Sequence, residues 1–395
     1  MTMSSWKSIT AAAVVAAVTA VALPAAAQAP VKIGASISMT GTYAKPGIYQ
    51  KEGYELCVQE ANDKGGLLGR KIDLVVYDDQ STPATGQRLY EKLITEDKVD
   101  VVMGPYSSAI SEAVANVTEK YKKVMVAPLA ATTSIFKKGR KYIFMVISPA
   151  EVYLEGLVDI AAKRGLKTIA IVNEDTLFPK TAANGTAEFA KKRGLQIVLQ
   201  EAYPKGNTDF SALLTKIKAA NPDVIAASTY FDDAVALTRQ MKELNVTPKM
   251  YGVTVGGDLP EFYDLLKQNA EYIYGATQWE PTLPYPGQKE FMASYQKKFN
   301  HEPSYHAAAG YAGCVLYLDA VKKAGTLDAD KVREQLLKLE TRTMLGDYKV
   351  DADGFQTAHK MVLFQWQDGK KVTVWPDDLA AGGKARFPTP PWNQR

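Results

Sequence analysis

Residues 31–79 read VKIGASISMTGTYAKPGIYQKEGYELCVQEANDKGGLLGRKIDLVVYDD, and this stretch sets the architecture of the chain. The two ends of the stretch, 31–39 and 71–79, are apolar and rich in β-branched residues, whereas 49–63 has the period of a helix. Near-continuous apolar runs on either side of a helix are typical of strands covered on both faces. The stretch therefore predicts a parallel β–α–β unit with a right-handed crossover.

The same alternation continues along the chain and then repeats. The first set adds helices at 84–96 and 108–121 and strands at 99–105 and 123–130. A second set follows the apolar segment 142–148, with helices at 150–163, 178–193, 209–220 and 232–244 and strands at 167–175, 195–203, 223–229 and 249–255. Two successive sets predict an α/β fold with two doubly wound parallel-sheet lobes and a cleft between them.

The last third of the chain adds elements to both lobes. An apolar segment at 272–279 is followed by helical patterns at 287–299, 304–324 and 328–340. Alternating apolar residues then surround Asp353-Gly354 and Asp368-Gly369, which are turn signals. The helices and the hairpin must dock on lobes already begun, so the chain crosses between the lobes several times. We expect the Pro-rich segment after Trp375 to form a loose tail.

The first 27 residues have the three parts of a secretory signal. Lys7 precedes an apolar run from Ile9 to Leu23, and small residues follow up to Ala27, after which we expect cleavage. A membrane anchor is the alternative, but the run is shorter than the roughly 20 residues that span a bilayer. No cysteine follows the signal, which disfavours a lipid anchor. The sequence predicts an exported protein of the periplasm.

Composition excludes several classes of protein. The chain has 395 residues, 46% of them hydrophobic, and a net charge of +4, which is too small an excess to indicate a nucleic-acid partner. Three histidines and two cysteines leave few ligands for a metal, so we predict no metal site and no cofactor. Cys57 and Cys314 either pair in the oxidising compartment or are small buried core residues, and the pattern does not decide between these alternatives.

Catalytic patterns are absent from the sequence. It contains no GxSxG, GxGxxG, P-loop or HExxH motif at the required context. His301 precedes Glu302, but His306 lies five residues on, so the helical spacing of a metal site fails. We interpret His301, His306 and His359 as surface or packing residues and predict no catalytic residue, so the chain is not expected to be an enzyme.

Candidate ligand-binding residues lie where loops follow the predicted strands, because open parallel sheets bind ligands beyond the carboxyl ends of their strands. Ser107 or Ser108 is a candidate helix N-cap, and the same helix end is suited to a carboxylate through its dipole and amide donors. Aromatic residues in these loops favour a ligand with an apolar or aromatic body. The predicted set is Tyr43, Tyr106, Ser107, Ser108, Leu129, Ala130, Ala131, Thr132, Phe178, Tyr230, Phe231 and Thr254.

The segments NDKGGLLGRKIDLVVYDD (62–79) and VMGPYSS (102–108) resemble the type I periplasmic binding proteins of ABC transporters, specifically the leucine/isoleucine/valine-binding family. The resemblance extends over the mature chain to about Trp375. It implies a Venus-flytrap receptor with a three-segment hinge, placed here near 147–150, 277–281 and 342–346. The implied units are a signal peptide at 1–27, an N-terminal lobe at 30–148 and 279–343, a C-terminal lobe at 149–278 and 344–376, and a tail at 377–395.

The resemblance also implies roles for individual residues. Ser108 matches the serine that meets the ligand carboxylate, and 129–132 matches the segment that shares this task. Phe178 and Tyr230 match aromatic residues of the second lobe. Thr254 departs from the pattern, because amino-acid-binding members carry an acid there for the ligand ammonium. Asp232 or Asp258 could replace that acid.

We therefore expect a receptor for a small organic carboxylate, with aromatic acids ahead of aliphatic ones, that delivers its ligand to an ABC permease in the membrane. A receptor for branched-chain or other neutral amino acids is the alternative. A ligand-sensing module of a signalling system is disfavoured because the sequence shows no membrane segment or effector domain. We expect a monomer.

Overall fold

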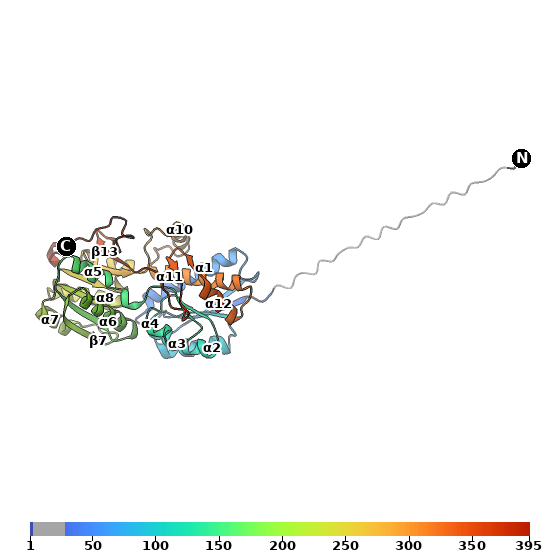
Figure 1. Ribbon diagram of the computed structural model, residues 1–395, viewed down its shortest axis with the longest axis horizontal. Coiled ribbons are helices and arrows are strands. Elements are labelled where there is room, and N and C mark those ends of the chain that lie inside the picture. Colours follow the sequence, from blue (N-terminus) through green and yellow to red (C-terminus); the bar gives the residue numbers. More distant parts are fainter. Residues whose placement is uncertain (3–27) are drawn as a thin grey trace.

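The computed structural model describes residues 1–2 and 28–395, so the predicted signal peptide lies almost wholly outside the described residues. Figure 1 shows two lobes side by side: α1–α4 and α10–α12 belong to the first lobe, and α5–α8 belong to the second. The predicted α/β fold is confirmed. No helix of the described residues is long and apolar enough to cross a membrane.

The first lobe is built on a five-stranded parallel sheet of order β2-β1-β3-β4-β5. Strands β1, β3, β4 and β5 are buried, as the Val/Ile/Met runs predict, whereas β2 at the edge of the sheet is mostly half-buried. Their bounds are β1 Val31–Ile37, β2 Ile72–Asp78, β3 Val101–Met103, β4 Met125–Ala127 and β5 Ile143–Met145. The order reverses direction between β1 and β3, so the loops after these two strands open a crevice at the sheet edge.

The second lobe has a seven-stranded sheet of order β14-β13-β10-β9-β8-β6-β7. The five strands from β10 to β7 are parallel, and β13 and β14 add antiparallel strands at one edge. The bounds are β6 Thr168–Glu174, β7 Gln196–Tyr203, β8 Val224–Ser228, β9 Met250–Val253, β10 Tyr274–Thr277, β13 Val362–Gln367 and β14 Lys370–Trp375. Its switch point lies between β6 and β8. The turn between β13 and β14 is Asp368-Gly369, both with positive φ, as the turn signal predicts.

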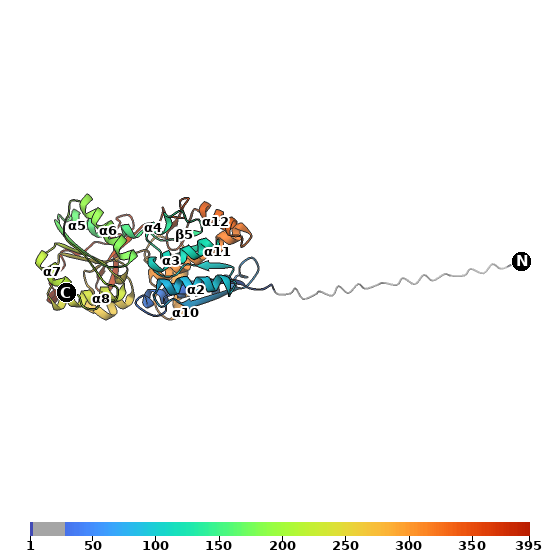
Figure 2. The same cartoon turned by 90° about the horizontal axis from the view of Figure 1, so that it is seen from below.

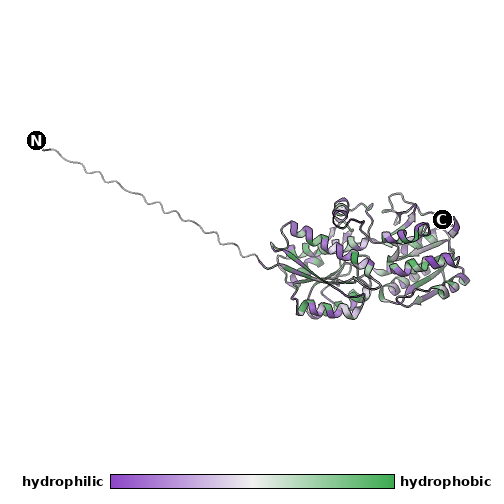
Figure 3. Cartoon of the chain, turned by 180° about the vertical axis from the view of Figure 1, so that it is seen from behind, coloured by the Kyte–Doolittle hydropathy of each residue, from purple (hydrophilic) through white to green (hydrophobic). Residues whose placement is uncertain are grey.

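Helices cover both faces of each sheet. In Figure 2, α5 and α6 lie on one side of the second sheet and α8 on the other, and in Figure 3 the helices carry separate hydrophobic and hydrophilic faces. Their bounds are α1 Ala44–Asp63, α2 Pro83–Thr95, α3 Ser108–Lys120, α4 Thr133–Phe136, α5 Glu155–Lys163, α6 Leu177–Lys192, α7 Ser211–Ala220, α8 Phe231–Glu243, α9 Pro260–Leu266, α10 Gln288–Phe299, α11 Tyr305–Ala324 and α12 Ala329–Lys338. Short 3-10 helices are η1 Ala150–Val152, η2 Val255–Gly257, η3 Lys267–Ala270 and η4 Trp392–Gln394, and a small sheet pairs β11 Thr341–Arg342 with β12 Asp347–Tyr348.

Helices α1 and α11 pack in close contact although they are far apart in the sequence. A Cβ atom at Gly53 would overlap the backbone at Ala307, and one at Gly310 would overlap the backbone at Gln50, so glycine is required at both contacts. The same pair of helices carries a disulfide between Cys57 and Cys314, whose Cα atoms lie 6.2 Å apart. Of the two alternatives that the sequence leaves open for the cysteines, the structure contains the bond.

Three segments cross between the lobes and are hydrogen-bonded to one another. The amide of Ser148 donates to the Gln278 side chain at 3.0 Å, and the Ser148 hydroxyl donates to the carbonyl of His359 at 3.1 Å. Ser148 and Gln278 lie in the ranges 147–150 and 277–281, where crossings are predicted. The third differs from the prediction at 342–346: Gly354 accepts a hydrogen bond from Met145 of β5, so the chain is still on the first lobe there. The two-stranded β11–β12 unit and its turn extend the first lobe before the chain crosses.

The segment after Trp375 is not loose, contrary to the sequence prediction. Trp392 is 7% exposed and donates through its indole nitrogen to the carbonyl of Val246 at 2.8 Å. Upstream, the side chain of Gln365 in β13 bonds both the amide and the carbonyl of Arg386. The tail therefore packs along the second lobe, where side chains of the sheet satisfy backbone groups that proline-rich sequence leaves without regular partners.

Candidate functional site

A small void lies between the lobes, where the loops after the strands of both sheets meet. Its volume is about 10 Å³, which is room for about one water molecule, so the side chains of the two lobes nearly fill the space in this closed form. Its walls are made by Tyr106, Ser107, Ser108, Leu129, Ala131, Ile147, Tyr153, Phe178, Tyr230, Val255 and Tyr305. None of these side chains is charged, and five are aromatic.

The first lobe contributes the N-terminus of α3 and the loop after β4. Ser107 is the N-cap of α3, with a φ of 73°, and its hydroxyl accepts from the amide of Ile110 at 3.4 Å. The Ser108 hydroxyl accepts from the amides of Ala131 and Thr132 at 3.2 and 3.3 Å, which fixes the two loops to each other. Ser107 thus caps the helix, and Ser108 faces the neighbouring loop, where its hydroxyl donates no hydrogen bond to any of the described residues.

Thr132 supplies a second polar group, in the loop after β4 whose residues Leu129 and Ala131 line the void. Its side-chain oxygen is buried and has no hydrogen-bond partner among the described residues. A buried hydroxyl without a partner costs free energy, commonly about 1–3 kcal/mol, unless a ligand or water satisfies it. The end of α3 also carries a partial positive charge from the helix dipole. Together, Ser108, Thr132 and the helix end form a site suited to an oxygen anion.

Aromatic rings from both lobes meet across the void. The Tyr230 ring, at the N-terminus of α8, lies 4.5 Å from Tyr43, 6.2 Å from Tyr106 and 5.8 Å from Phe178, measured between centroids. Phe178 in turn contacts Tyr153 at 4.9 Å. Because Tyr43 and Tyr106 belong to the first lobe and Tyr230 belongs to the second, the contacts of Tyr230 with these two rings exist only when the lobes are closed.

Polar contacts around the rim also join the closed lobes. The Lys205 ammonium, after β7, donates to the carbonyl of Ser81 at 2.7 Å and lies 4.0 Å from the centre of the Tyr43 ring. The Tyr43 hydroxyl donates to Glu174 at 3.4 Å. On another side of the cleft, Lys45 pairs with Glu261 at 3.1 Å. These groups bring opposite charges and a cation–π pair together across the lobes.

The structure brings most of the predicted residues together. Seven line the void directly: Tyr106, Ser107, Ser108, Leu129, Ala131, Phe178 and Tyr230. Tyr43 stands behind Tyr230, and the other predicted residues lie in the same loops without lining the space: Ala130, Thr132, Phe231 and Thr254. The Thr254 hydroxyl bonds both the amide and the carbonyl of Thr229, at 2.9 and 2.8 Å, so it braces the loop after β8.

Four lining residues are missing from the sequence prediction: Ile147, Tyr153, Val255 and Tyr305. Ile147 and Tyr153 belong to the first crossing and the turn after it, and Tyr305 begins a helix from the last third of the chain. Of these four residues, only Val255 lies in one of the loops after strands in which ligand-binding residues were predicted. Tyr305 follows Ser304, an N-cap signal, but nothing local indicates that this helix end reaches the cleft.

The acidic residues that could face a ligand ammonium lie outside the void. Asp232 is exposed. Both oxygens of Asp258 are engaged, one with the Lys371 ammonium at 2.9 Å and the other with the amide of Tyr305 at 3.2 Å. Asp233, also outside the void, is held by the Tyr203 hydroxyl, and burial raises the pKa of Asp233 to about 7. Burial also raises the pKa of Glu174, whose carboxylate accepts from Thr176 at 2.7 Å.

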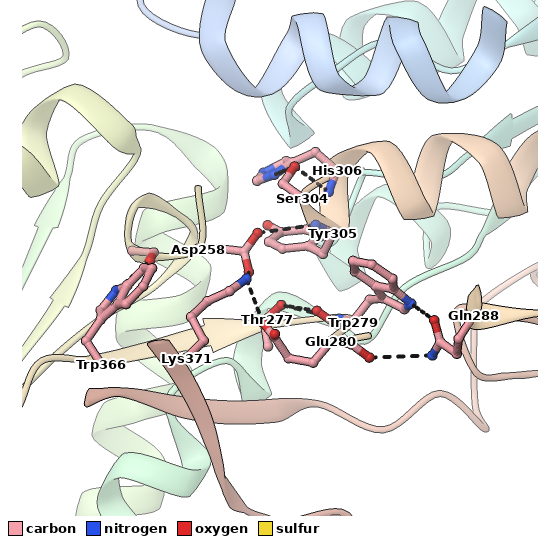
Figure 4. A network of polar contacts seen from close by, with 11 residues as sticks. Asp258, Thr277, Trp279, Glu280, Gln288, Ser304, Tyr305, His306, Trp366 and Lys371 are labelled. Carbon is pink, nitrogen blue, oxygen red and sulfur yellow. Dashed lines mark hydrogen bonds and ion pairs between the residues drawn. The ribbon is translucent and has the colours of Figure 1, made fainter. Parts of the chain in front are cut away.

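A buried cluster of charges lies beside the void, at the second crossing (Figure 4). The Lys371 ammonium of β14 lies 2.9 Å from Asp258 and 2.7 Å from Glu280. The two carboxylates are 0% and 4% exposed, and burial raises the pKa of Glu280. One ammonium thus serves two buried carboxylates. On its outer side the cluster borders a more open cavity of about 710 Å³, which includes Trp366, Tyr263 and Glu261 in its walls.

The side chains needed to hold a metal do not gather in the described part of the chain. No group of three or more histidine, cysteine, aspartate or glutamate residues is arranged there so that it could hold a metal ion. His306 and His359 are packing residues, one beside the void and one at the third crossing. His301 bonds Glu52 at 3.2 Å on the first lobe.

Comparison with known proteins agrees with this geometry. The family described as periplasmic binding protein matches residues 30–371. The Leu/Ile/Val-binding protein homolog 7 of Brucella suis biovar 1 is 30% identical over 378 residues, covering 91% of this chain and 94% of that protein.

Two solved structures share the fold. The substrate-binding protein LivJ of Streptococcus pneumoniae, in complex with isoleucine, has a TM-score of 0.81 and 24% identity and covers 91% of this chain and 100% of its own. A solute-binding protein of an ABC transporter from Rhodopseudomonas palustris BisB5, in complex with 3,4-dihydroxybenzoic acid, has a TM-score of 0.77 and 25% identity and covers 87% of this chain and 95% of its own. The chain belongs to the type I periplasmic binding proteins of ABC transporters, in the Leu/Ile/Val-binding family.

Proposed function

We propose that this protein is an extracytoplasmic receptor for a small organic carboxylate, with an aromatic acid preferred, and that it delivers the ligand to an ABC permease. The observation that carries the proposal is the uncharged, largely aromatic lining of the void beside the N-terminus of α3. A carboxylate is stabilised by the helix end and by Ser108 and Thr132. An α-ammonium would lie among the rings without a counter-charge, which costs several kcal/mol.

In the proposed mechanism the carboxylate first binds the loops of the first lobe. The second lobe then closes, and Tyr230 and Phe178 cover the apolar body of the ligand. Contacts to both lobes exist only in the closed form, so the ligand shifts the equilibrium toward closure by its differential affinity. The permease recognises the closed form. We further propose that the protein acts as a monomer in the periplasm after cleavage at Ala27, with the lobe division given above apart from the third crossing.

A receptor for neutral amino acids is the second candidate, and one observation favours it. Glu174 is buried at the end of β6 and contacts the Tyr43 hydroxyl at 3.4 Å, one ring away from Tyr230. A side-chain movement that exposed this carboxylate to the void would give an ammonium its counter-charge. The isoleucine complex of the pneumococcal protein belongs to the same fold.

Matched pairs of ligands separate the two candidates. We expect benzoate, hydrocinnamate and isocaproate to raise the melting temperature, because a ligand that binds only the folded state stabilises it. Hydrocinnamate is phenylalanine without its amino group, and isocaproate is leucine without it, so each amino acid is the control for its own acid. Stabilisation by leucine and phenylalanine but not by the acids would contradict the proposal and make Glu174 the next residue to replace.

Replacing Tyr230 by alanine is expected to weaken binding of the preferred acid more than tenfold, equivalent to at least about 1.4 kcal/mol, measured by calorimetry. The reason is that this ring contacts rings of both lobes. Tyr230→Phe keeps the ring and is the matched control, for which we expect a change of roughly threefold or less. A dissociation constant unchanged in Tyr230→Ala would remove this residue from the site.

A further inference from the structure

Three polar side chains contact one another in a row, those of Tyr106, His306 and Ser304, and the first of them lines the void. The Tyr106 hydroxyl lies 3.4 Å from Nε2 of His306, and Nδ1 of the same ring lies 3.3 Å from the hydroxyl of Ser304. Tyr106 is 3% exposed, and the other two are 0% exposed. Figure 4 shows Ser304 and His306 together at the start of α11, on either side of Tyr305 in the chain.

The hydrogen-bond donors and acceptors of these three side chains determine which ring nitrogen of His306 carries the proton. The Ser304 hydroxyl already accepts from the amide of His306 at 3.2 Å, and a hydroxyl has a single hydrogen to donate. If Nδ1 of His306 carried the ring proton, the hydrogen of Ser304 would have no acceptor among the described residues. If Nδ1 is bare, it accepts from Ser304, and the ring proton is on Nε2. Nε2 then donates to the Tyr106 oxygen.

This arrangement commits the Tyr106 oxygen as an acceptor and leaves its own hydrogen available. Among the described residues the Tyr106 hydroxyl has one hydrogen-bond partner, Nε2 of His306, so with the ring proton on Nε2 the hydrogen of Tyr106 is free, and Tyr106 lines the void. Burial raises the pKa of Tyr106 well above its usual value, so the hydrogen stays in place. Burial also lowers the pKa of His306 to about 3, while the nearby charges Asp258 and Lys371 act on it in opposite directions, so the ring is neutral at physiological pH.

We propose that His306 is a positioning residue that holds Tyr106 as a hydrogen-bond donor to the ligand carboxylate. This inference rests on the proposed function for the identity of the acceptor, whereas the proton arrangement itself does not depend on any ligand. The donor adds to the groups proposed at Ser108 and Thr132, and Tyr106 precedes Ser108 by two residues in the loop after β3. A charged carboxylate accepts a stronger hydrogen bond than a neutral carbonyl, so a hydrogen bond donated by Tyr106 favours acids over their amides.

The first test is the ¹⁵N spectrum of the histidine rings in the full protein. The chain has three histidines, and the spectrum of His306→Gln identifies the signals of His306 by their loss. We expect the neutral form with the proton on Nε2 between pH 6 and 8, with and without benzoate. A proton on Nδ1, or a ring that titrates in this range, would overturn the proposal.

The second test is a set of variants titrated with benzoate and with benzamide. We expect Tyr106→Phe and His306→Leu each to weaken benzoate binding about tenfold and benzamide binding less. His306→Gln keeps an N–H donor near the position of Nε2 and should restore benzoate affinity to within about threefold of the original. The double variant Tyr106→Phe/His306→Leu should bind no more weakly than Tyr106→Phe alone.

Losses of affinity that add in the double variant, or equal losses for benzoate and benzamide, would contradict the proposed role of His306. Should His306→Leu fail to fold, the spectrum and the His306→Gln titration decide the matter. If the unaltered protein binds no aromatic acid, the proposed function fails, but the ring spectrum still supports or overturns the position of the proton. The two failures are therefore distinguishable.

Discussion

Lys371→Met is expected to lower the free energy of unfolding by about 3 kcal/mol, because it removes the ammonium that pairs with the buried carboxylates of both Asp258 and Glu280. The figure is the lower end of the range for breaking a buried ion pair, since the Lys371 side chain is 15% exposed and water screens part of the interaction. Urea denaturation followed by circular dichroism measures the loss. Lys370→Met is the matched control on the neighbouring, exposed residue and should change stability by less than about 0.5 kcal/mol.

The pH dependence of this effect follows from the same charges. In Lys371→Met the carboxylates of Asp258 and Glu280 face each other without a cation, and protonation of one relieves the cost. The destabilisation should therefore be largest near pH 8 and shrink as the pH falls toward 5. Glu280→Gln in the Lys371→Met background should recover part of the loss at pH 8. A variant as stable as Lys370→Met at every pH would show that the cluster does not stabilise the fold.

Removing the disulfide is expected to cost a similar or larger amount. Cys57 and Cys314 are 257 residues apart in the sequence, and the chain-entropy estimate for a loop of this length is about 5.5 kcal/mol. We expect Cys57→Ala/Cys314→Ala to lose stability in the lobe that contains α1 and α11, while the second lobe unfolds at an unchanged urea concentration.

Reduction supplies the control for this prediction. Dithiothreitol should lower the stability of the unaltered protein to that of the double variant and should leave the double variant unchanged. A double variant that unfolds at the same urea concentration as the oxidised protein would show that packing between α1 and α11 holds these helices without the bond.

Local pattern was sufficient to predict most helices and strands. The predicted helix at 178–193 is α6 Leu177–Lys192, and the predicted strand at 223–229 is β8 Val224–Ser228. Burial on both faces gives these strands continuous apolar runs, and this signal needs no knowledge of the partner. The short helix α9 Pro260–Leu266 was not predicted, because seven residues contain too few turns for a period to be recognised.

The residues of the candidate site show the same difference between those that a local pattern predicts and those that it does not. Ser108 and Tyr230 were found because each follows a strand, and the geometry of parallel sheets brings strand ends together. Tyr153 and Tyr305 were missed because a crossing segment and a docked helix carry them to the void. The tail was expected to be loose because its composition is rich in proline, but hydrogen bonds from Gln365 in β13 hold it on the sheet.

The sequence by itself determined the α/β alternation, the repetition that makes two lobes, the loops that face the cleft and the resemblance to the binding-protein family. Each of these depends on residues close together in the chain, where periodicity and motif spacing act directly. Only the tertiary structure decided that Cys57 pairs with Cys314, that Lys371 joins Asp258 and Glu280, and that His306 lies against Tyr106. These pairings bring together segments far apart in the chain, and they are set by how helices and sheets pack rather than by any local pattern.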